Sequence, residues 1–207
     1  MIARFMRDTR LGGMEFEMQL APGFRPRRSG VSVSRFRPRR SARADASGAS
    51  LFLLLHGFAA EVNEPRLENR MWQLMMQAPQ LFRNGTHQKR FEAATREGLT
   101  GSAGQTSAVF LLTADEFLWN VARPAVTADT IDFAAIRIHG VDLDGYVLFQ
   151  TAKDLCAGTR HITLSELTNP DIVSDQAFGL IVTAFLVERH GAALLHTEKE
   201  KYICQIM

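Results

Sequence analysis

Cysteine is scarce in this sequence, and the residue spacings typical of metal sites are missing. Cys156 and Cys204 are the two cysteines among 207 residues, and neither forms a ligand spacing with the other or with a histidine. Neither a disulfide framework nor a zinc site is therefore indicated, and we expect a reduced, cytoplasmic protein. The six histidines include no pair three or four residues apart, so a helix-borne metal site has no support. We expect neither a metal nor another cofactor.

Long hydrophobic runs are also missing, although 46% of the residues are hydrophobic. The apolar run at residues 177–187 has eleven residues, whereas a membrane-spanning helix needs roughly 20. We therefore expect no membrane span. The composition is that of an ordinary globular chain, and for this length one domain plus an extension is the natural organisation.

Three segments resemble catalytic or ligand-binding motifs, but each lacks a required feature. Residues 51–57, an apolar run that ends in His-Gly, resemble the opening of an α/β-hydrolase, yet the nearest approach to a G-x-S-x-G motif, residues 100–104, lacks the first glycine. The loop at residues 99–107 has the wrong spacing for a phosphate-binding loop and contains no lysine. The D-x-D-G of residues 142–145 lacks the first and last calcium ligands of an EF-hand. We expect no catalytic residues.

Charge is unevenly distributed along the chain. Residues 1–50 contain eleven arginines and four acidic residues, a net charge of +7, whereas the remaining residues contain thirteen basic and eighteen acidic ones, a net charge of −5. The formal net charge of +2 therefore hides a basic extension joined to a mildly acidic body. This asymmetry argues against a basic nucleic-acid-binding surface spread over the whole protein.

The basic extension has too few apolar residues to offset the entropy of ordering, and we predict that it is disordered. Three interpretations of it are open. The first is an uncommitted tail, and Met71, Met75 or Met76 would then be sensible beginnings for the folded part. The second is a targeting segment. The third is an arm that binds phosphate backbones. The arginines of the arm are Arg25, Arg27, Arg28, Arg35, Arg37, Arg39, Arg40 and Arg43.

Residues 171–191 are predicted to form the helix around which the architecture is built. Ser174 can cap its beginning, and Gly191 can supply the residue with positive φ at its end. Between these two residues the chain is apolar on almost every side, and a helix of that composition belongs in the middle of a core. We therefore expect Phe178 and Phe185 to be buried.

Further helices are predicted from apolar spacing and capping residues. Residues 61–81 carry a methionine-rich stripe at helical spacing, which is either core or an adaptable contact surface, core being preferred. A helix capped by Asn84 or Thr86 follows it, and then one kinked helix or two helices in residues 106–121.

The second half of the chain is less uniform. A helix is predicted at residues 145–157 with Gly158 after its end, whereas residues 131–138 fit either a short helix or a strand. A helix-turn-helix in residues 162–191 is not favoured, because its long helix has few basic residues for a DNA groove. His87 is expected to be a surface or capping histidine, and the carboxylates are expected at caps and surfaces.

Several short patterns follow one another in residues 81–195. They are an F-x-x-x-x-H-x-x-x-F opening (Phe82, His87, Phe91), V-F-L-L at residues 109–112, Leu118-Trp119, Ile131-Asp132-Phe133 and two closing helices. This order resembles that of an uncharacterised family of small helical proteins from bacterial phages and mobile elements. The basic extension and the loop at residues 99–107 depart from the family. The resemblance implies a compact helical accessory protein and transfers no activity.

We therefore predict a mostly α protein in four parts: a disordered basic extension at residues 1–50, an apolar segment at 51–61, a compact helical domain at 62–196 around the last long helix, and a tail at 197–207. The expected function is that of a non-enzymatic accessory or interaction protein of a phage or mobile element, with a protein partner. The alternative is a nucleic-acid-associated protein that uses residues 25–43 as a non-specific binding arm.

Overall fold

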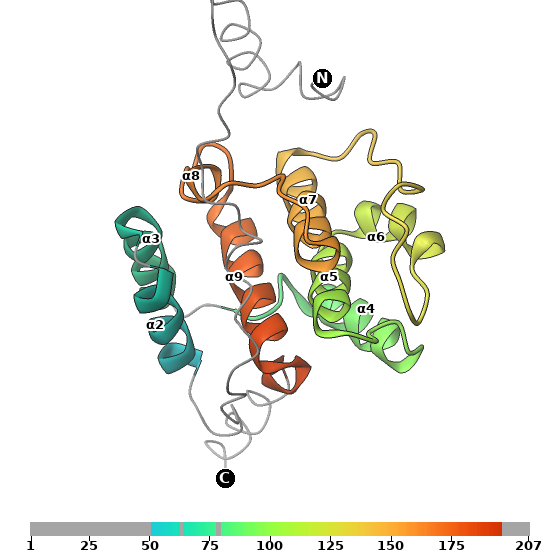
Figure 1. The fold of residues 1–207 in the computed structure, drawn as a ribbon, viewed down its shortest axis with the longest axis horizontal. Coiled ribbons are helices and arrows are strands. Elements are labelled where there is room, and N and C mark those ends of the chain that lie inside the picture. The colour runs from blue at the N-terminus through green and yellow to red at the C-terminus, as the bar shows by residue number, and fades with distance from the viewer. Residues whose placement is uncertain (1–50, 63, 78–79, 196–207) are drawn as a thin grey trace, which may run out of the picture.

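The computed structural model describes residues 51–62, 64–77 and 80–195, which form helices joined by loops, with no β-strand among them (Figure 1). The prediction of a mostly α fold is confirmed. The predicted extension at residues 1–50 and the tail at residues 197–207 lie outside the described residues. In chain order the elements are α2 (Leu51–Val62), α3 (Pro65–Met76), α4 (Gly85–Arg96), α5 (Ala103–Thr113), α6 (Glu116–Ala122), η3 (Arg123–Ala125), α7 (Leu143–Ala157), α8 (Leu164–Leu167), α9 (Asp175–His190) and η4 (Ala192–Leu195).

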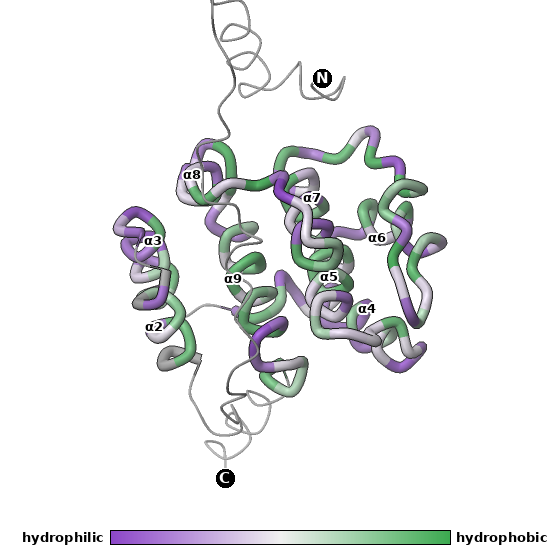
Figure 2. Tube along the Cα trace, viewed as in Figure 1, coloured by the Kyte–Doolittle hydropathy of each residue, from purple (hydrophilic) through white to green (hydrophobic). Residues whose placement is uncertain are grey.

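Helix α9 is surrounded by other helices along most of its length, as its composition predicts. Every residue from 177 to 187 is buried, including Phe178 and Phe185. In Figure 1 the helix lies between the α2–α3 pair on one side and α5 and α7 on the other. Figure 2 shows it as hydrophobic over most of its length. Burial of one large apolar side chain stabilises a fold by roughly 1.5–3 kcal/mol, so α9 contributes a large part of the favourable folding free energy.

The ends of α9 follow from two capping residues. The prediction of Ser174 as the cap is confirmed: the helix begins at Asp175, and Ser174 Oγ accepts a hydrogen bond from a first-turn backbone N–H (3.1 Å). Ser174 Oγ itself donates to Asp144 Oδ2 (2.6 Å), which ties the start of α9 to the first turn of α7. Gly191 ends the helix with a φ of 88°, a backbone conformation that favours glycine.

Helices α5 and α7 approach each other closely because a glycine lies at their contact. A Cβ atom at Gly104 would lie 2.9 Å from the backbone oxygen of Leu155, closer than real Cβ atoms approach a neighbour. Residues 105–113 of α5 are all buried. Because α5 contacts both α7 and α9, it is the second central helix of the fold.

Helices α2 and α3 form a pair whose inner side packs against α9. The buried residues of the pair are Leu55, Phe58, Ala59, Leu67, Arg70, Met71 and Met75. The rings of Phe58 and Phe185 lie 5.5 Å apart between centroids, which joins α2 to α9. The preference for core is therefore confirmed for the buried methionines. Because buried side chains of α2 precede Met71, the folded part of the chain begins upstream of the methionines.

A charged side chain, Arg70, is buried where α3 meets the turns that precede α9. The side chain is 6% exposed and donates to the backbone oxygens of Leu167 (2.7 Å) and Val173 (2.5 Å). It also donates to Asp175 Oδ1 (3.0 Å) and lies 4.4 Å from the ring centre of Phe178. A guanidinium presents five donors in a rigid fork, so one side chain satisfies all three acceptors while its face contacts an aromatic ring.

The segment at residues 131–138 forms neither the helix nor the strand that its composition allows. Val126 and Ile131 pair through an isolated antiparallel bridge, and turns follow. Asp132 Oδ1 accepts hydrogen bonds from the backbone N–H groups of residues 134 (3.0 Å) and 135 (3.3 Å), and this local alternative competes with regular structure. Ile131, Phe133 and Ile136 of the segment are nevertheless buried.

The remaining boundaries follow local capping. In residues 106–121 the two-helix alternative is correct, because Asp115 caps α6 through a hydrogen bond from Leu118 N (2.8 Å). Helix α7 begins two residues before the predicted Gly145, because Asp142 is its N-cap. Its end at Gly158, with a φ of 71°, is as predicted.

Removal of the Arg70 guanidinium is expected to loosen α3 from α9. For Arg70→Met we expect the free energy of unfolding to fall by roughly 2–4 kcal/mol, because two buried carbonyl groups lose their donor. Urea unfolding followed by circular dichroism measures this. Arg66→Met, an exposed change in the same helix, is the matched control and should stay within about 0.5 kcal/mol of the parent. Equal effects of the two substitutions would contradict the role given to Arg70.

Candidate functional site

The predicted nucleic-acid-binding arginines do not lie in the described part of the chain. Arg25, Arg27, Arg28, Arg35, Arg37, Arg39, Arg40 and Arg43 all fall within residues 1–50, outside the described residues. The structure therefore neither brings these side chains together nor separates them. Candidate sites within the described residues come from exposed apolar side chains and from buried ionisable groups.

The most unusual surface of the described body is the outer side of α2 and α3. Met76 is 81% exposed and Trp72 is 38% exposed, one helical turn apart on the same side of α3. The ring of His56 from α2 packs edge-on against Trp72, with centroids 5.6 Å apart and an interplanar angle of 82°. Large apolar side chains gathered at a surface are typical of contact sites.

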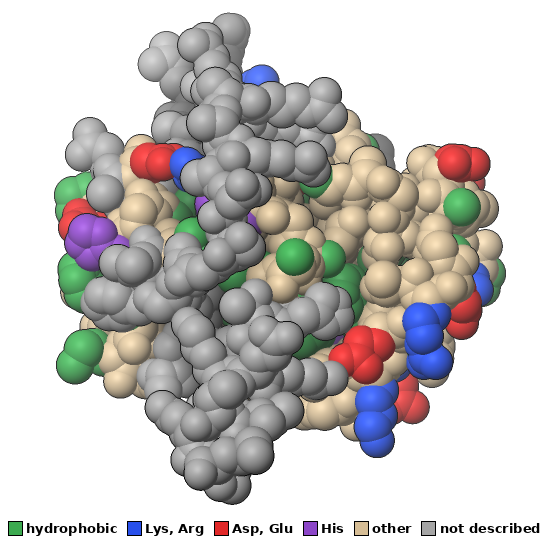
Figure 3. Space-filling view, turned by 90° about the horizontal axis from the view of Figure 1, so that it is seen from below, with side chains coloured by type: hydrophobic (Ala, Val, Ile, Leu, Met, Phe, Trp, Pro, Cys, Tyr) green, Lys and Arg blue, Asp and Glu red, His purple; other side chains and the backbone are tan. Residues whose placement is uncertain are grey.

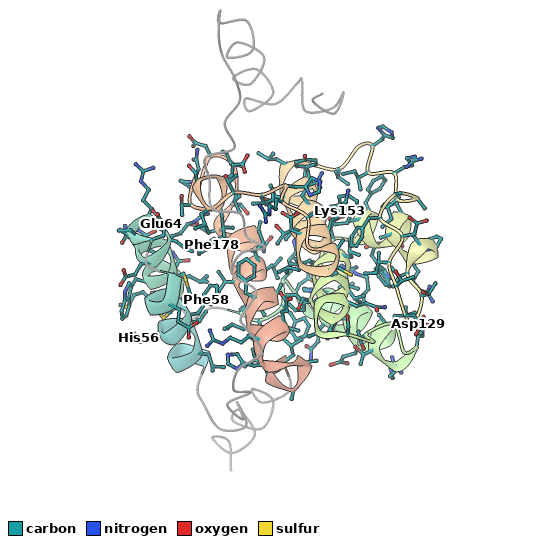
Figure 4. The ribbon with its side chains drawn as sticks, in the orientation of Figure 1. His56, Phe58, Glu64, Asp129, Lys153 and Phe178 are labelled. Atoms are coloured by element: carbon teal, nitrogen blue, oxygen red, sulfur yellow. The ribbon has the colours of Figure 1, made fainter. Side chains whose placement is uncertain are left out.

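Acidic residues continue this side of α3 toward its beginning. Glu68 precedes Trp72 by four residues, and Glu64 precedes Glu68 by four, so the three lie along one side of the helix. We call the surface formed by His56, Glu64, Glu68, Trp72 and Met76 the outer face. Figure 4 shows His56 at the outer edge, whereas Phe58 and Phe178 lie between the α2–α3 pair and α9. In Figure 3 hydrophobic, acidic and histidine side chains lie side by side at the left edge of the molecule, where α2 and α3 are.

A second ion pair holds the outer face in position from the α2 side. Both carboxylate oxygens of Glu61 accept from the guanidinium of Arg189 near the end of α9. This hydrogen bonding holds the pKa of Glu61 below its ordinary value, against the opposite effect of partial burial. Within the described residues Glu61 is therefore paired with a cation, whereas the two glutamates of the outer face form no ion pair there.

The described residues also contain a buried carboxylate next to a histidine, an arrangement that occurs in catalytic dyads and triads. Asp154, in α7, has no exposed side-chain surface, and its Oδ1 accepts from His161 Nδ1 (2.7 Å) and from Thr159 Oγ1 (2.7 Å). Its Oδ2 accepts from the backbone N–H of His161 (2.8 Å) and of Ile162 (2.9 Å). The expectation that carboxylates lie only at caps and surfaces is therefore wrong for Asp154.

The Asp154 carboxylate is explained by the turn that follows α7. All its donors come from residues 159–162, so the side chain replaces the backbone partners that this turn lacks. Burial raises the pKa of Asp154, but the hydrogen bonds from His161, Ile162 and Thr159 outweigh burial, and the pKa lies below its ordinary value. Because the carboxylate accepts hydrogen bonds from four donors of one turn, it stabilises the conformation of that turn, and we assign it a structural role.

His87 is buried, so it is not a surface histidine, although its ring accepts a hydrogen bond from the backbone N–H of the residue before the N-cap of α4. Its Nδ1 accepts from Arg83 N (3.0 Å) and its Nε2 donates to Phe110 O (2.9 Å), so the ring is the neutral tautomer with the proton on Nε2. Phe82 and Phe110 pack against the ring, with centroids 5.1 and 4.8 Å away. Burial lowers the pKa of His87 to about 4. The ring thus joins α4 to α5 and is not a ligand-binding histidine.

Other classes of site have no support in the described chain. Within residues 51–62, 64–77 and 80–195, no three His, Cys, Asp or Glu side chains are grouped so that they could hold a metal ion. The described helices include none with the length and apolarity needed to cross a bilayer. A helix-turn-helix at residues 162–191 is also absent, because α8 has four residues and most of α9 is buried.

Comparison of this chain with family models, with curated proteins and with solved structures finds no match. The outer face is therefore the candidate site on geometry alone. The sequence predicts a methionine-rich stripe in residues 61–81 but does not indicate that Trp72 and Met76 form an exposed side of this helix. Helical spacing holds the missing signal, because Trp72 and Met76 lie four residues apart and Leu67, Met71 and Met75 occupy another side of α3.

The neutral, buried state of His87 predicts an acid-sensitive fold. The imidazole has a pKa of about 6.5 in the unfolded chain and about 4 in the folded protein, so between these values the unfolded state binds more protons. We expect the free energy of unfolding to be largest above pH 6.5 and to fall by up to about 3 kcal/mol as the pH decreases to about 4.

Urea unfolding of the parent and of His87→Gln at several pH values measures this contribution. Glutamine does not titrate and retains an N–H donor, so the variant should lose most of the pH dependence between 6.5 and 4. Burial also lowers the pKa of His190, and the hydrogen bond from Arg189 lowers the pKa of Glu61; both contributions remain in parent and variant. The same pH dependence in parent and variant would rule out His87 as its source.

Proposed function

We propose that this chain is a non-enzymatic interaction protein, an accessory protein of a phage or mobile element, which binds a protein partner through the outer face. The observation that supports it most directly is the 81% exposure of Met76 beside Trp72 and His56. Aromatic residues and methionine are enriched in protein–protein interfaces. The origin in a phage or mobile element is supported by the sequence resemblance in residues 81–195 alone.

The rigidity of the outer face favours this function. Met71 and Met75 anchor one side of α3 in the core, while Arg70 ties the helix to the start of α9. A partner that contacts Trp72 and Met76 therefore meets side chains on a fixed helix and orders few backbone residues on binding, which reduces the entropic cost of association.

Affinity purification from the cells that naturally contain the protein tests this function. Parent chain and the double variant Trp72→Ala/Met76→Ala are compared by quantitative mass spectrometry. We expect at least one protein to be retained by the parent and reduced about tenfold or more with the double variant, because a buried tryptophan is often an interface hot spot.

Phe117→Ala is the matched control, since Phe117 is another exposed aromatic residue but belongs to α6. A partner lost equally with both variants, or with neither, would show that the outer face does not bind it. Circular dichroism of the variants checks that the helical fold is retained.

The second candidate function is non-specific nucleic-acid binding by the arm, and the clustering of eight arginines in residues 25–43 favours it. Arginine side chains that neutralise phosphates release counterions, so binding weakens steeply with salt. The mildly acidic remainder of the chain would then serve as the body that carries the arm.

Salt titration of binding to random-sequence DNA distinguishes this function. The full chain is compared with a full chain in which all eight arginines are changed to glutamine. We expect the slope of log K against log salt to be about −0.9 for each phosphate contact in the parent and close to zero in the variant. Equal slopes, or negligible binding by both chains, would remove this candidate.

A further inference from the structure

We propose that the arginine-rich segment of this chain, residues 25–43, docks on the outer face of its own α2–α3 pair and covers it in the free protein. The inference rests on the proposed function in one respect, that the outer face is a binding surface. The proposal goes beyond that function by naming the segment that occupies the outer face in the free protein. An external partner must then displace this segment, so the segment regulates partner binding.

The side chains of residues 25–43 are chemically complementary to those of the outer face. The outer face offers an exposed aromatic ring at Trp72, an exposed thioether at Met76, and carboxylates at Glu68 and Glu64. Guanidinium groups pair with carboxylates and stack on indole rings, and the arm supplies eight of them within 19 residues. The sequence Arg35-Phe36-Arg37 adds an aromatic side chain between two cations.

Net charge also favours docking of the segment, and it acts over a longer range than these contacts. Residues 1–50 carry a net charge of +7 and the rest of the chain carries −5, so the segment and the body attract each other. On the outer face itself, Glu64 and Glu68 are the two carboxylates, whereas Glu61 nearby is already paired with Arg189. The attraction is therefore directed to α3 and not to the whole α2–α3 pair.

The point at which the chain enters the fold brings the segment within reach. Seven residues separate Arg43 from Leu51, the first residue of α2, and they span up to about 25 Å. The contact of His56 with Trp72 places the tryptophan beside the second turn of α2, which is about 8 Å from Leu51 along the helix axis. Glu68 and Glu64 follow at about 6 and 12 Å farther along α3.

The short connection makes docking within one chain much more favourable than docking between chains. A tether of this length gives an effective concentration in the millimolar range, so contacts that are individually weak suffice to populate the docked state. Exposed ion pairs and cation–π contacts have that strength. Docking should consequently be sensitive to salt and to the removal of any one of the main contacts.

Limited trypsin digestion of the full purified chain tests the proposal. Trypsin cuts after arginine, and cleavage follows the fraction of time for which the segment is undocked. We expect cleavage after Arg27, Arg28, Arg35, Arg39, Arg40 and Arg43 to be about three- to tenfold faster in Glu64→Gln/Glu68→Gln and in Trp72→Ala than in the parent. In 0.5 M salt the parent should be cut as fast as the variants.

The matched control is Glu97→Gln/Asp129→Asn, which removes two exposed negative charges elsewhere. Figure 4 shows Asp129 at the edge of the molecule opposite His56 and Glu64. This control should leave the cleavage rate at the level of the parent. Equal rates in all the proteins would overturn the proposal, and so would an equal acceleration by the control, because attraction would then be non-specific.

Protein concentration identifies the source of the segment. A cleavage rate that is independent of concentration supports docking within one chain, whereas faster cleavage on dilution would show that the segment of a second copy occupies the face and would overturn the proposal. Because the digestion contains no partner protein, its result is separate from that of the partner purification. The segment can fail to dock while a partner binds, or dock while no partner is found.

Discussion

The absence of any polar side on α9 is the constraint on which this structure depends. A helix whose residues 177–187 are all apolar or small must be covered all round, and one neighbouring helix cannot do so. The α2–α3 pair covers one side, and α5 and α7 cover the other. The outer face therefore exists as a consequence: the helices that cover α9 have a second side, and on α3 that side carries Trp72 and Met76.

Buried polar side chains in this fold bind backbone groups of other segments more often than they bind each other. Arg70 donates to the carbonyl groups of Leu167, at the end of α8, and of Val173. His87 donates to that of Phe110, and the side chain of Gln105 to that of Leu99 (3.0 Å). Asp154 accepts from the turn after α7. These side chains satisfy backbone groups that regular structure leaves without a partner. Polar burial here fixes loops and helix ends, and this explains the structural roles assigned to the histidine and the aspartate.

The success of prediction from the sequence depended on how far apart the interacting residues are. Ser174, Asp142 and Gly158 cap helices through contacts within a few residues, so their roles could be read locally. The burial of α9 could be predicted because its composition leaves no other outcome. Arg70 could not, since its partners are 97 to 105 residues away, and neither could the burial of His87 beside Phe110. The outer face is intermediate between these local and long-range cases. The four-residue spacing of Trp72 and Met76 is local, but which side of α3 is buried depends on its contact with α9.

The two charge pairs of the α2–α3 pair lie at opposite ends of α9. Arg70 reaches Asp175, the first residue of the helix, and Glu61 reaches Arg189, the second to last. A shift of the α2–α3 pair along α9 by one helical turn, about 5.4 Å, would separate both charge pairs. It would also break the close packing of Leu74 against Gly179, where a Cβ atom would lie 3.3 Å from Leu74 Cδ1. Charge pairs at the two ends of α9 and close packing between them therefore favour one axial position of the pair.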